Sequence, residues 1–364
     1  MQLVAMGAQD VHLTGDPKVS FFRSTYQRHT HFSGLTDRQL IQGRPTPGGI
    51  STLRFERKGD LLSYVYLTAA DTNGTIKKID WSTVIDKVEL MIGGQVIDTQ
   101  DFFYMSRIDP VLLTKSFSQK YNGDNLCSYF LPLKFFFCKE WQSALPLIAL
   151  QYHDIEIRIT WSSSLNSNLQ IDGSSSSTPG SELQYQGWAR FIFLDKMERE
   201  YFAGSQMDLL IEQVQRILVP NSDKADIILS HPVKFIASNI LPYTGQVVKQ
   251  QINGTDVADF VPLPHFVDVP QYYHTPYGYI GSANSGGIST NQSNVFLVPF
   301  CLDTSKLQPT GTLNFSRIDS YKLLATSPTG SVSWQTLIGS PYFYAVNYNI
   351  LRVQNGMGAL LYAN

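Results

Sequence analysis

Apolar and polar residues alternate with a period of two in several short segments of this chain. Leu53-Arg54-Phe55-Glu56-Arg57 shows the alternation, and so do residues 88–92 and 95–98. Side chains two positions apart on a strand share one face, so this pattern predicts half-buried strands. Gly93-Gly94 separates the last two segments, and glycine suits a turn whose two central residues both need a positive φ. We therefore predict a β-hairpin at this point.

The second half of the chain repeats the order of elements found in the first. After Gly93-Gly94, the first half continues with an apolar run at 131–137, a strand at 150–159 and an aromatic strand at 188–194. The second half has a turn at Asn253-Gly254, followed by corresponding segments at 295–300, 313–324 and 342–351. Strands follow one another without regular helices between them, which favours paired β-sandwiches over a parallel sheet. Two matching all-β units without a catalytic motif indicate a building block.

The segments between these strands suggest how the chain is divided. Residues 1–31 read as an extended polar arm, and the first unit begins near Phe32. A short helix is predicted at 101–115, and flexible loops at 162–187 and 281–293, which are rich in Ser, Asn and Gly. Residues 195–217 have near-helical apolar spacing and are the best helical candidate. The predicted division is an arm at 1–31, a first unit at 32–204, a linker at 205–218 and a second unit at 219–364.

Length and composition support two packed units with much neutral surface. A chain of 364 residues corresponds to about two domains. Charged residues make up 16% of it, against about 25% in a usual soluble protein. Extensive protein–protein contact would explain this composition, and so would a β-rich fold with long polar loops. The net charge of −2 argues against direct nucleic-acid binding, because neutralising phosphates requires clustered Lys and Arg.

Candidate chemistry is sparse, and no cofactor is predicted. Cys127, Cys138 and Cys301 are widely spaced and odd in number, which favours reduced thiols. His29-Thr30-His31 lacks the further acid and histidine that a metal-binding β-barrel would need, so we expect no metal there. The chain has no apolar run long enough to cross a bilayer, and its first residues do not read as a secretory signal.

Asn-x-Ser/Thr sequons occur at four positions. Asn253 lies in a predicted turn and Asn291 in a predicted loop, so these two are candidate glycosylation sites. Asn73 and Asn314 also match, although Asn314 falls in a predicted strand. Without a secretory signal, conventional glycosylation is not expected.

Several distinctive sequence blocks follow one another from end to end of the chain: Gln2 to Val11 with Leu13-Thr14-Gly15-Asp16-Pro17, Ile92-Gly93-Gly94-Gln95, Ala144 to His153, Leu210-Ile211-Glu212-Gln213, Gln308 to Asp319, Asn347 to Arg352 and Gly356 to Asn364. In this order the blocks resemble the major capsid proteins of nucleocytoplasmic large DNA viruses. The resemblance implies an all-β fold of two tandem eight-stranded antiparallel jelly rolls, with short helices in the loops and linker. The chain is short for this family, with a compressed stretch at 231–253, so the resemblance implies modest loops.

The resemblance also implies a structural, non-enzymatic role. Three chains would form a pseudo-hexagonal capsomer that tiles an icosahedral shell in the virion, assembled in the host cytoplasm. Implied partners are neighbouring capsomers, minor capsid and penton proteins and the internal virion membrane, without direct nucleic-acid contact. Residues 163–183 and 282–294 would be outward or lateral loops.

The arm is the segment we expect to mediate assembly, through Phe21, Phe22, Arg23, Tyr26 and Arg28, because aromatic and arginine side chains are common interface anchors. Alternatively, Phe21 and Phe22 cover the base of the first jelly roll. Three other functions remain open at this point: a minor or vertex-proximal capsid paralogue, a glycan-cleaving amidase, or a glycan-binding protein. The last would use Tyr272, Tyr273, Tyr277 and Tyr279 as an exposed platform.

Overall fold

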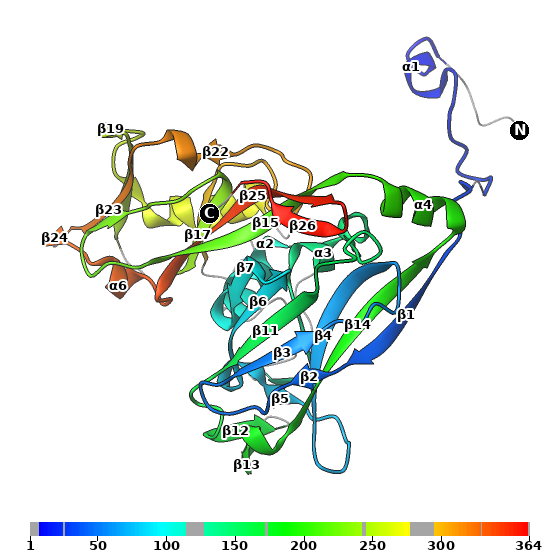
Figure 1. Ribbon diagram of the computed structural model, residues 1–364. Helices are drawn as coiled ribbons and strands as arrows, with labels where there is room; N and C mark the ends of the chain where they lie inside the picture. Colours follow the sequence, from blue (N-terminus) through cyan, green and yellow to red (C-terminus); the bar gives the residue numbers. More distant parts are fainter. Residues whose placement is uncertain are drawn as a thin grey trace, which may run out of the picture.

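The chain folds into two β-rich bodies joined side by side, with the amino-terminal arm projecting from the first (Figure 1). The computed structural model describes residues 7–24, 26–113, 127–171, 174–241, 245–276, 295–328 and 330–362. Strands in these residues form five sheets. The strand β1 begins at Phe32, and the fold is two successive jelly rolls.

Two five-stranded sheets pack face to face in the first jelly roll. Sheet 1 contains, in order, β1 (Phe32–Gln39), β14 (Gln184–Leu194), β4 (Leu61–Ala70) and β10 (Leu145–Pro146), with β9 (Phe130–Pro132) also paired to β4. Sheet 2 contains β2 (Ile41–Gln42), β3 (Ile50–Arg54), β11 (Ile155–Trp161), β6 (Ile85–Ile92) and β7 (Gln95–Asp101). In β11 the buried Ile155, Ile157 and Ile159 alternate with less buried polar residues, so one face is fixed in the core.

The predicted hairpin at Gly93-Gly94 is confirmed. It joins β6 to β7 with φ values of 57° and 82°, which glycine adopts without steric cost. The turn at Asn253-Gly254 is confirmed as well, with φ values of 50° and 77°.

The prediction of a loop over residues 162–187 is wrong. This segment contains β12 (Asn168–Ile171) and β13 (Ser174–Pro179), which form sheet 3 with β5 (Ile79–Asp80) and β8 (Cys127–Ser128), and β14 begins at Gln184. The polar composition suggested a loop, but Ile171 pairs with Ile79 of β5 and gives the hairpin a partner. Residues 281–293, the other predicted loop, lie outside the described residues.

Sheets 4 and 5 build the second jelly roll. Sheet 4 contains β15 (Met207–Leu218), β25 (Tyr342–Gln354), β17 (Pro232–Asn239) and β21 (Val295–Pro299), with β22 (Leu313–Asn314) on β17 and β26 (Met357–Leu360) on β25. Sheet 5 contains β16 (Lys224–Asp226), β23 (Tyr321–Ser327), β18 (Val247–Ile252) and β19 (Thr255–Asp256), with β20 (Val261–Pro262) on β18 and β24 (Gly330–Ser331) on β23.

The helix predicted over 195–217 is right only in its first half. Helix α4 (Lys196–Gly204) begins where the Asp195 carboxylate accepts a hydrogen bond from Glu198 N at 2.9 Å, a regular N-cap. Residues from Met207 onward, predicted as a linker, instead form β15, which pairs over its whole length with β25. The apolar spacing in β15 fits a helix locally, but the long-range pairing overrides it.

Three other predicted strands are shorter than expected. In the segment 131–137, β9 ends at Pro132 and helix α3 (Phe136–Lys139) follows. In the segment 150–159, strand β11 begins only at Ile155. At 313–324, a 3-10 helix, η7 (Phe315–Arg317), separates β22 from β23.

The helix predicted at 101–115 is confirmed as far as Leu112. It consists of a π-helical turn, η2 (Tyr104–Ile108), and α2 (Asp109–Leu112), where Pro110 occupies a first-turn position that needs no backbone N–H. The remaining short helices are α1 (Val11–Thr14), η1 (Trp81–Thr83), η4 (Trp141–Ser143), η5 (Gly180–Glu182), η6 (Leu263–Phe266), α5 (Asp268–His274) and α6 (Trp334–Leu337).

The hydrophobic core does not divide at the boundary between the two jelly rolls. One cluster of buried side chains fills the first jelly roll and continues onto sheet 4 through Phe235, Ala237, Tyr344 and Val346. A second, smaller cluster lies between sheets 4 and 5. The two jelly rolls therefore share buried apolar surface and behave as one folded body.

Candidate functional site: the junction of the jelly rolls and the arm

The two jelly rolls meet edge to edge, with strand β7 of sheet 2 facing strand β15 of sheet 4. The Asp98 carboxylate on β7 accepts a hydrogen bond from Val214 N on β15 at 2.9 Å. In return the Gln213 side-chain amide donates to the carbonyl oxygen of Ile97. Side chains thus replace the backbone ladder here, and each edge gives one backbone group of the other a hydrogen-bond partner.

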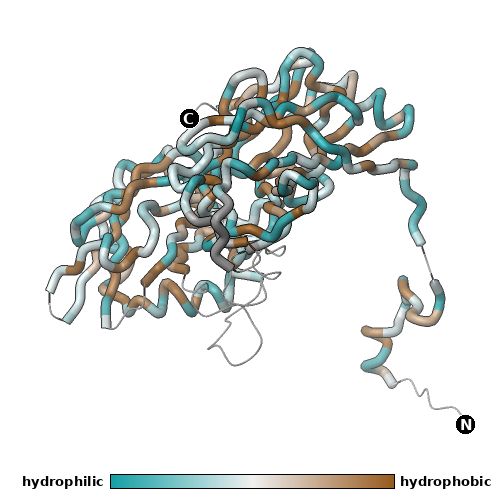
Figure 2. Tube along the Cα trace, turned by 90° about the horizontal axis from the view of Figure 1, so that it is seen from below, coloured by the Kyte–Doolittle hydropathy of each residue, from teal (hydrophilic) through white to brown (hydrophobic). Residues whose placement is uncertain are grey.

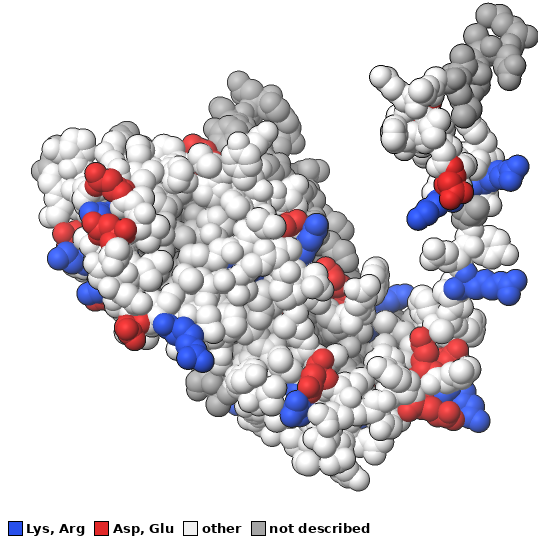
Figure 3. All heavy atoms as spheres, turned by 90° about the horizontal axis from the view of Figure 1, so that it is seen from above, with Lys and Arg blue, Asp and Glu red and all other residues white. Residues whose placement is uncertain are grey.

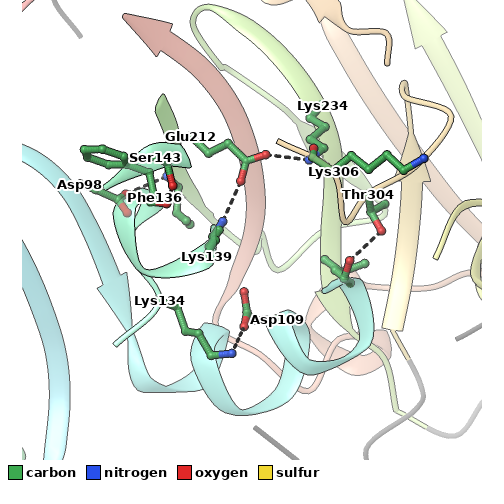
Figure 4. Close-up of polar contacts among 12 residues, drawn as sticks. Asp98, Asp109, Lys134, Phe136, Lys139, Ser143, Glu212, Lys234, Thr304 and Lys306 are labelled. Atoms are coloured by element: carbon green, nitrogen blue, oxygen red, sulfur yellow. Dashed lines mark hydrogen bonds and ion pairs between the residues drawn. The ribbon is translucent and has the colours of Figure 1, made fainter. Parts of the chain in front are cut away.

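A buried ionic cluster lies beside this edge (Figure 4). The Glu212 carboxylate on β15 accepts from Lys139 Nζ at 2.7 Å and from Lys234 Nζ at 2.6 Å. Lys139 comes from α3 of the first jelly roll, whereas Lys234 lies on β17 of the second. The Glu212 side chain is only 4% exposed and that of Lys234 only 1%. The cluster therefore ties elements of both jelly rolls to one charge.

Burial and charge act in opposite directions on these groups. Burial alone would raise the pKa of Glu212, but the ammonium groups of Lys139 and Lys234 outweigh it and hold that pKa below its usual value. For Asp98 burial wins, and its pKa is raised despite the hydrogen bonds from Val214 N and Gln100. Asp109, fully buried on α2, has its charge balanced by Lys134 at 3.3 Å.

An aromatic contact continues the junction next to the charges. Tyr344 on β25 packs against Phe103 and Tyr104 of the first jelly roll, with ring centroids 6.4 and 5.5 Å apart. Its hydroxyl donates to the Asp101 carboxylate at 2.7 Å. This hydrogen bond satisfies a phenol that would otherwise be buried without a partner.

The hairpin of β25 and β26 clamps the far end of the junction. Tyr152 N donates to the carbonyl oxygen of Gly356 at 2.9 Å, and His153 Nδ1 lies 3.0 Å from the carbonyl oxygen of Gly358. Gly356 has φ +79°, and a Cβ there would lie 2.5 Å from the Tyr152 ring; a Cβ on Gly358 would lie 2.7 Å from Leu150. Gly93 N also donates to the carbonyl oxygen of Asp154 at 2.9 Å, so segments around Gly93, His153 and Gly356 that are far apart in the sequence meet at one place.

The predicted assembly residues lie on an arm that extends away from the body (Figure 2). Phe21 is 94% exposed, Phe22 99% and Tyr26 85%, so in the single chain the two phenylalanines do not cover the base of the first jelly roll. Arg23 and Arg28 are exposed too. Near its root, the arm is held by Thr30, whose hydroxyl donates to Glu198 on α4 at 2.8 Å. Figure 3 shows basic side chains along the arm and broad uncharged areas on one face of the body.

The candidate glycosylation sites differ in what the structure describes. Asn253 is exposed in its turn, and its side-chain oxygen accepts from Asp319 N and Ser320 N at 2.9 and 3.1 Å. Asn291 lies outside the described residues, as do Tyr277 and Tyr279. Both asparagines remain candidate sites, and conventional glycosylation is still not expected at either.

The buried ionic cluster was missed in the sequence. The signal available was a lone Glu212 inside the apolar run Leu209 to Val214, a position where an unpaired charge would be costly. Among the described residues, no group of three or more His, Cys, Asp and Glu side chains could hold a metal ion, and no helix could span a membrane. His29 and His31 are exposed on the arm.

Two jelly rolls fused through a buried junction make this a double jelly-roll structural protein. Residues 20–195 match the family model described as the major capsid protein N-terminus. The chain is 32% identical to the major capsid protein of Pyramimonas orientalis virus, over 100% of this chain and 99% of that one. It is 30% identical to that of Paramecium bursaria Chlorella virus 1, with the same coverage.

Solved structures agree with these relatives. The crystal structure of PBCV-1 VP54 superposes with a TM-score of 0.71 at 25% identity, covering 95% of this chain and 100% of that chain. The Faustovirus major capsid protein has a TM-score of 0.60 at 12% identity, covering 96% and 94%, which speaks for the fold alone. The chain belongs to the major capsid proteins of the nucleocytoplasmic large DNA viruses, and its role is structural.

The alignment with the chlorella virus protein extends over 446 positions, more than the 364 residues of this chain, so that relative carries insertions which this chain lacks.

Proposed function

We propose that three copies of this chain form a capsomer with a pseudo-sixfold outline, and that such capsomers tile an icosahedral shell. The observation that carries this proposal is the fused junction: because each chain holds two similar jelly rolls in one body, three chains present six similar units. The low content of charged residues, 16%, supports permanent contacts between copies. Such interfaces commonly bury about 2,000–5,000 Å² and are more apolar than transient ones.

The chain acts as a scaffold in this proposal, not as an enzyme, and requires no cofactor. The arm residues Phe21, Phe22, Arg23, Tyr26 and Arg28 contact neighbouring capsomers, minor capsid or penton proteins, or the internal virion membrane. The exposure of these aromatic side chains supports this role. The shell is assembled in the host cytoplasm, and a net charge of −2 supports packaging without direct contact to the genome.

We infer that the arm spans 1–31 and the first jelly roll 32–204, and that the second jelly roll starts at 205 instead of 219. The continuous pairing of β15 with β25 supports this boundary, because it makes residues 207–218 part of a sheet of the second jelly roll.

Light scattering coupled to size-exclusion chromatography tests the capsomer. We expect a mass near 120 kDa, three times the 40.9 kDa of one chain. A species of 40.9 kDa at every concentration tested would overturn the proposal.

A further inference from the structure

Sheet 4 has an outer face, turned away from sheet 5, that a segment of the first jelly roll covers. Phe235, Ala237 and Tyr344 on this face belong to the same apolar cluster as helices η2 and α2. Their neighbours along the strands point the other way, into the second cluster. At the centre of the covered face, Asp101 accepts from the Tyr344 hydroxyl and lies 3.9 Å from Arg216, which is opposite Tyr344 on β15. An aromatic–arginine pair on a sheet thus meets an acid that precedes a helical segment.

Sheet 1 is the counterpart of sheet 4 in the duplicated chain. In each sheet, the last long strand of the jelly roll lies between the first strand and one other strand. The orders are β1-β14-β4 in sheet 1 and β15-β25-β17 in sheet 4. Trp188 on β14 lies opposite Arg38 on β1 and Tyr66 on β4. Tyr344 on β25 lies opposite Arg216 on β15 and Ala237 on β17 in the same way. The aromatic–arginine pair therefore recurs at the same place on sheet 1.

On sheet 1, however, the described chain leaves this aromatic and arginine surface partly exposed. Tyr66 stacks on Trp188 with centroids 6.3 Å apart and contacts Tyr64 and Phe130 at 6.4 and 5.9 Å, and Arg190 lies 5.9 Å over Tyr64. The rings of Tyr64, Tyr66 and Trp188 belong to neither apolar cluster and remain partly exposed. Neither Arg38 nor Arg190 forms an ion pair with a described residue. We call these residues the aromatic face.

The second jelly roll carries its own counterpart of η2 and α2. Helices η6 and α5 follow the Asn253-Gly254 hairpin as η2 and α2 follow the Gly93-Gly94 hairpin. Phe266 packs on Phe296 at 5.5 Å, and the Gln271 amide donates to the carbonyl oxygen of Val295 at 3.2 Å, so the segment is anchored to its own body. Its outer side still exposes Tyr272 by 61% and Tyr273 by 71%, with the rings 4.8 Å apart.

Charge is complementary between this segment and the aromatic face. Residues 257–274 contain Asp259 and Asp268 and neither Lys nor Arg, while Asp256 just before them is already paired with Lys249. The aromatic face presents Arg38 and Arg190. On sheet 4 the same combination, Arg216 with Asp101, already exists within one chain.

We propose that the aromatic face binds a second copy of this chain, whose η6–α5 segment covers it as η2 and α2 cover sheet 4. The contact inside one chain is thereby repeated between chains, which closes a ring of three. This inference rests on the proposed trimer and adds the surfaces through which it forms. Aromatic and arginine side chains in such a contact are the usual anchors of tight interfaces.

Photo-crosslinking of the purified full-length protein tests the contact directly. Tyr273 is replaced by the photoreactive residue benzoylphenylalanine, the assembled protein is irradiated, and the products are mapped by peptide mass spectrometry. We expect inter-chain crosslinks to the peptides containing β4 and β14. Crosslinks confined to other segments, in a protein that is trimeric by mass, would overturn this inference and leave the proposed capsomer standing; a wild-type protein that stays monomeric would overturn both.

Substitutions supply a second measurement. The double variant Tyr272→Ser/Tyr273→Ser should weaken association by about 30-fold or more, because truncated aromatic anchors commonly cost that much. Tyr201→Ser, which alters a 63% exposed tyrosine on α4, is the matched control and should associate like the wild type. Circular dichroism confirms that both variants fold. Wild-type association of the double variant would mean that another segment makes the contact. Trimers in which Trp188 keeps its full solvent reactivity would mean that the aromatic face stays uncovered. Either result would refute the proposal.

Discussion

Neutralising Glu212 should destabilise the chain more than altering an exposed glutamate does. In Glu212→Gln, the ammonium groups of Lys139 and Lys234 lose their shared carboxylate while they remain 12% and 1% exposed. Removing one partner of a buried ion pair costs about 3–5 kcal/mol, mostly because the remaining charge stays buried without compensation. We expect a loss of this size in the free energy of unfolding.

The matched control is Glu200→Gln on helix α4. Glu200 is 69% exposed and lies 3.9 Å from Lys196, which is 89% exposed. Exposed substitutions of this kind usually change stability by less than about 0.5 kcal/mol. A third variant, Glu212→Leu/Lys139→Met/Lys234→Met, removes all three charges together and should recover most of the lost stability, since apolar replacements of buried ionic groups are often neutral.

Urea denaturation, followed by tryptophan fluorescence at one fixed protein concentration, measures all three variants. The concentration must be fixed because association adds to apparent stability. The reasoning would be refuted by a loss below about 1 kcal/mol in Glu212→Gln, which is well under the cost of an orphaned buried charge. It would also be refuted if the triple variant were no more stable than Glu212→Gln.

Three further predictions concern other parts of the molecule. Gly356→Ala combines a φ of +79° with a Cβ 2.5 Å from the Tyr152 ring, whereas Gly254→Ala has a φ of +77° and open space around its Cβ. Thermal unfolding should show a loss of stability of about 1–2 kcal/mol for Gly254→Ala, the cost of a left-handed backbone, and a larger loss for Gly356→Ala. Equal losses would contradict close packing of Gly356 against Tyr152. Asp98→Asn should be more stable than the wild type at pH 7. Burial raises the pKa of Asp98 in the folded state above 3.8, so the wild type is most stable below pH 3.8, where Asp98 is protonated. It loses this stability as the pH rises through the raised pKa and the buried carboxyl becomes charged. The difference should shrink in urea titrations as the pH falls through this range, and a pH-independent difference would count against it. Deletion of residues 1–17 should leave trimers intact, as measured by light scattering, but should reduce the yield of closed shells in electron micrographs. A wild-type yield of closed particles would contradict a role of this segment in closure.

The sequence was most informative where local geometry decides the structure. The hairpins at Gly93-Gly94 and Asn253-Gly254 and the aromatic strands β14 and β25 could be predicted because positive φ and period-two alternation are local properties. Family resemblance then supplied the pairing of these strands into jelly rolls. Residues 162–187 and β15 were misread because their strands depend on partners far along the chain, and composition carries no record of such partners.

The junction could be predicted only in outline. The blocks around Gly93, His153 and Gly356 were visible in the sequence, but nothing local indicates that they meet. Glu212 is a charge in a mostly apolar stretch, but its partners Lys139 and Lys234 lie 73 and 22 positions away, so the cluster was missed. Phe21, Phe22 and Tyr26 are exposed on the arm, and the role of the arm residues in assembly stays a prediction.

The position of β15 has a consequence for how the chain is made. This strand leaves the ribosome soon after the first jelly roll, but its hydrogen-bonding partner β25 begins only at Tyr342, after β17, β21 and β22 of sheet 4 have been translated. Until then, the nascent strand has the β7 edge as its neighbour and one side of its backbone unsatisfied. Such a delay between synthesis and pairing favours slow folding and non-native association of unfinished chains. The strand that joins the two jelly rolls in the folded protein is therefore exposed to non-native association while the chain is being translated.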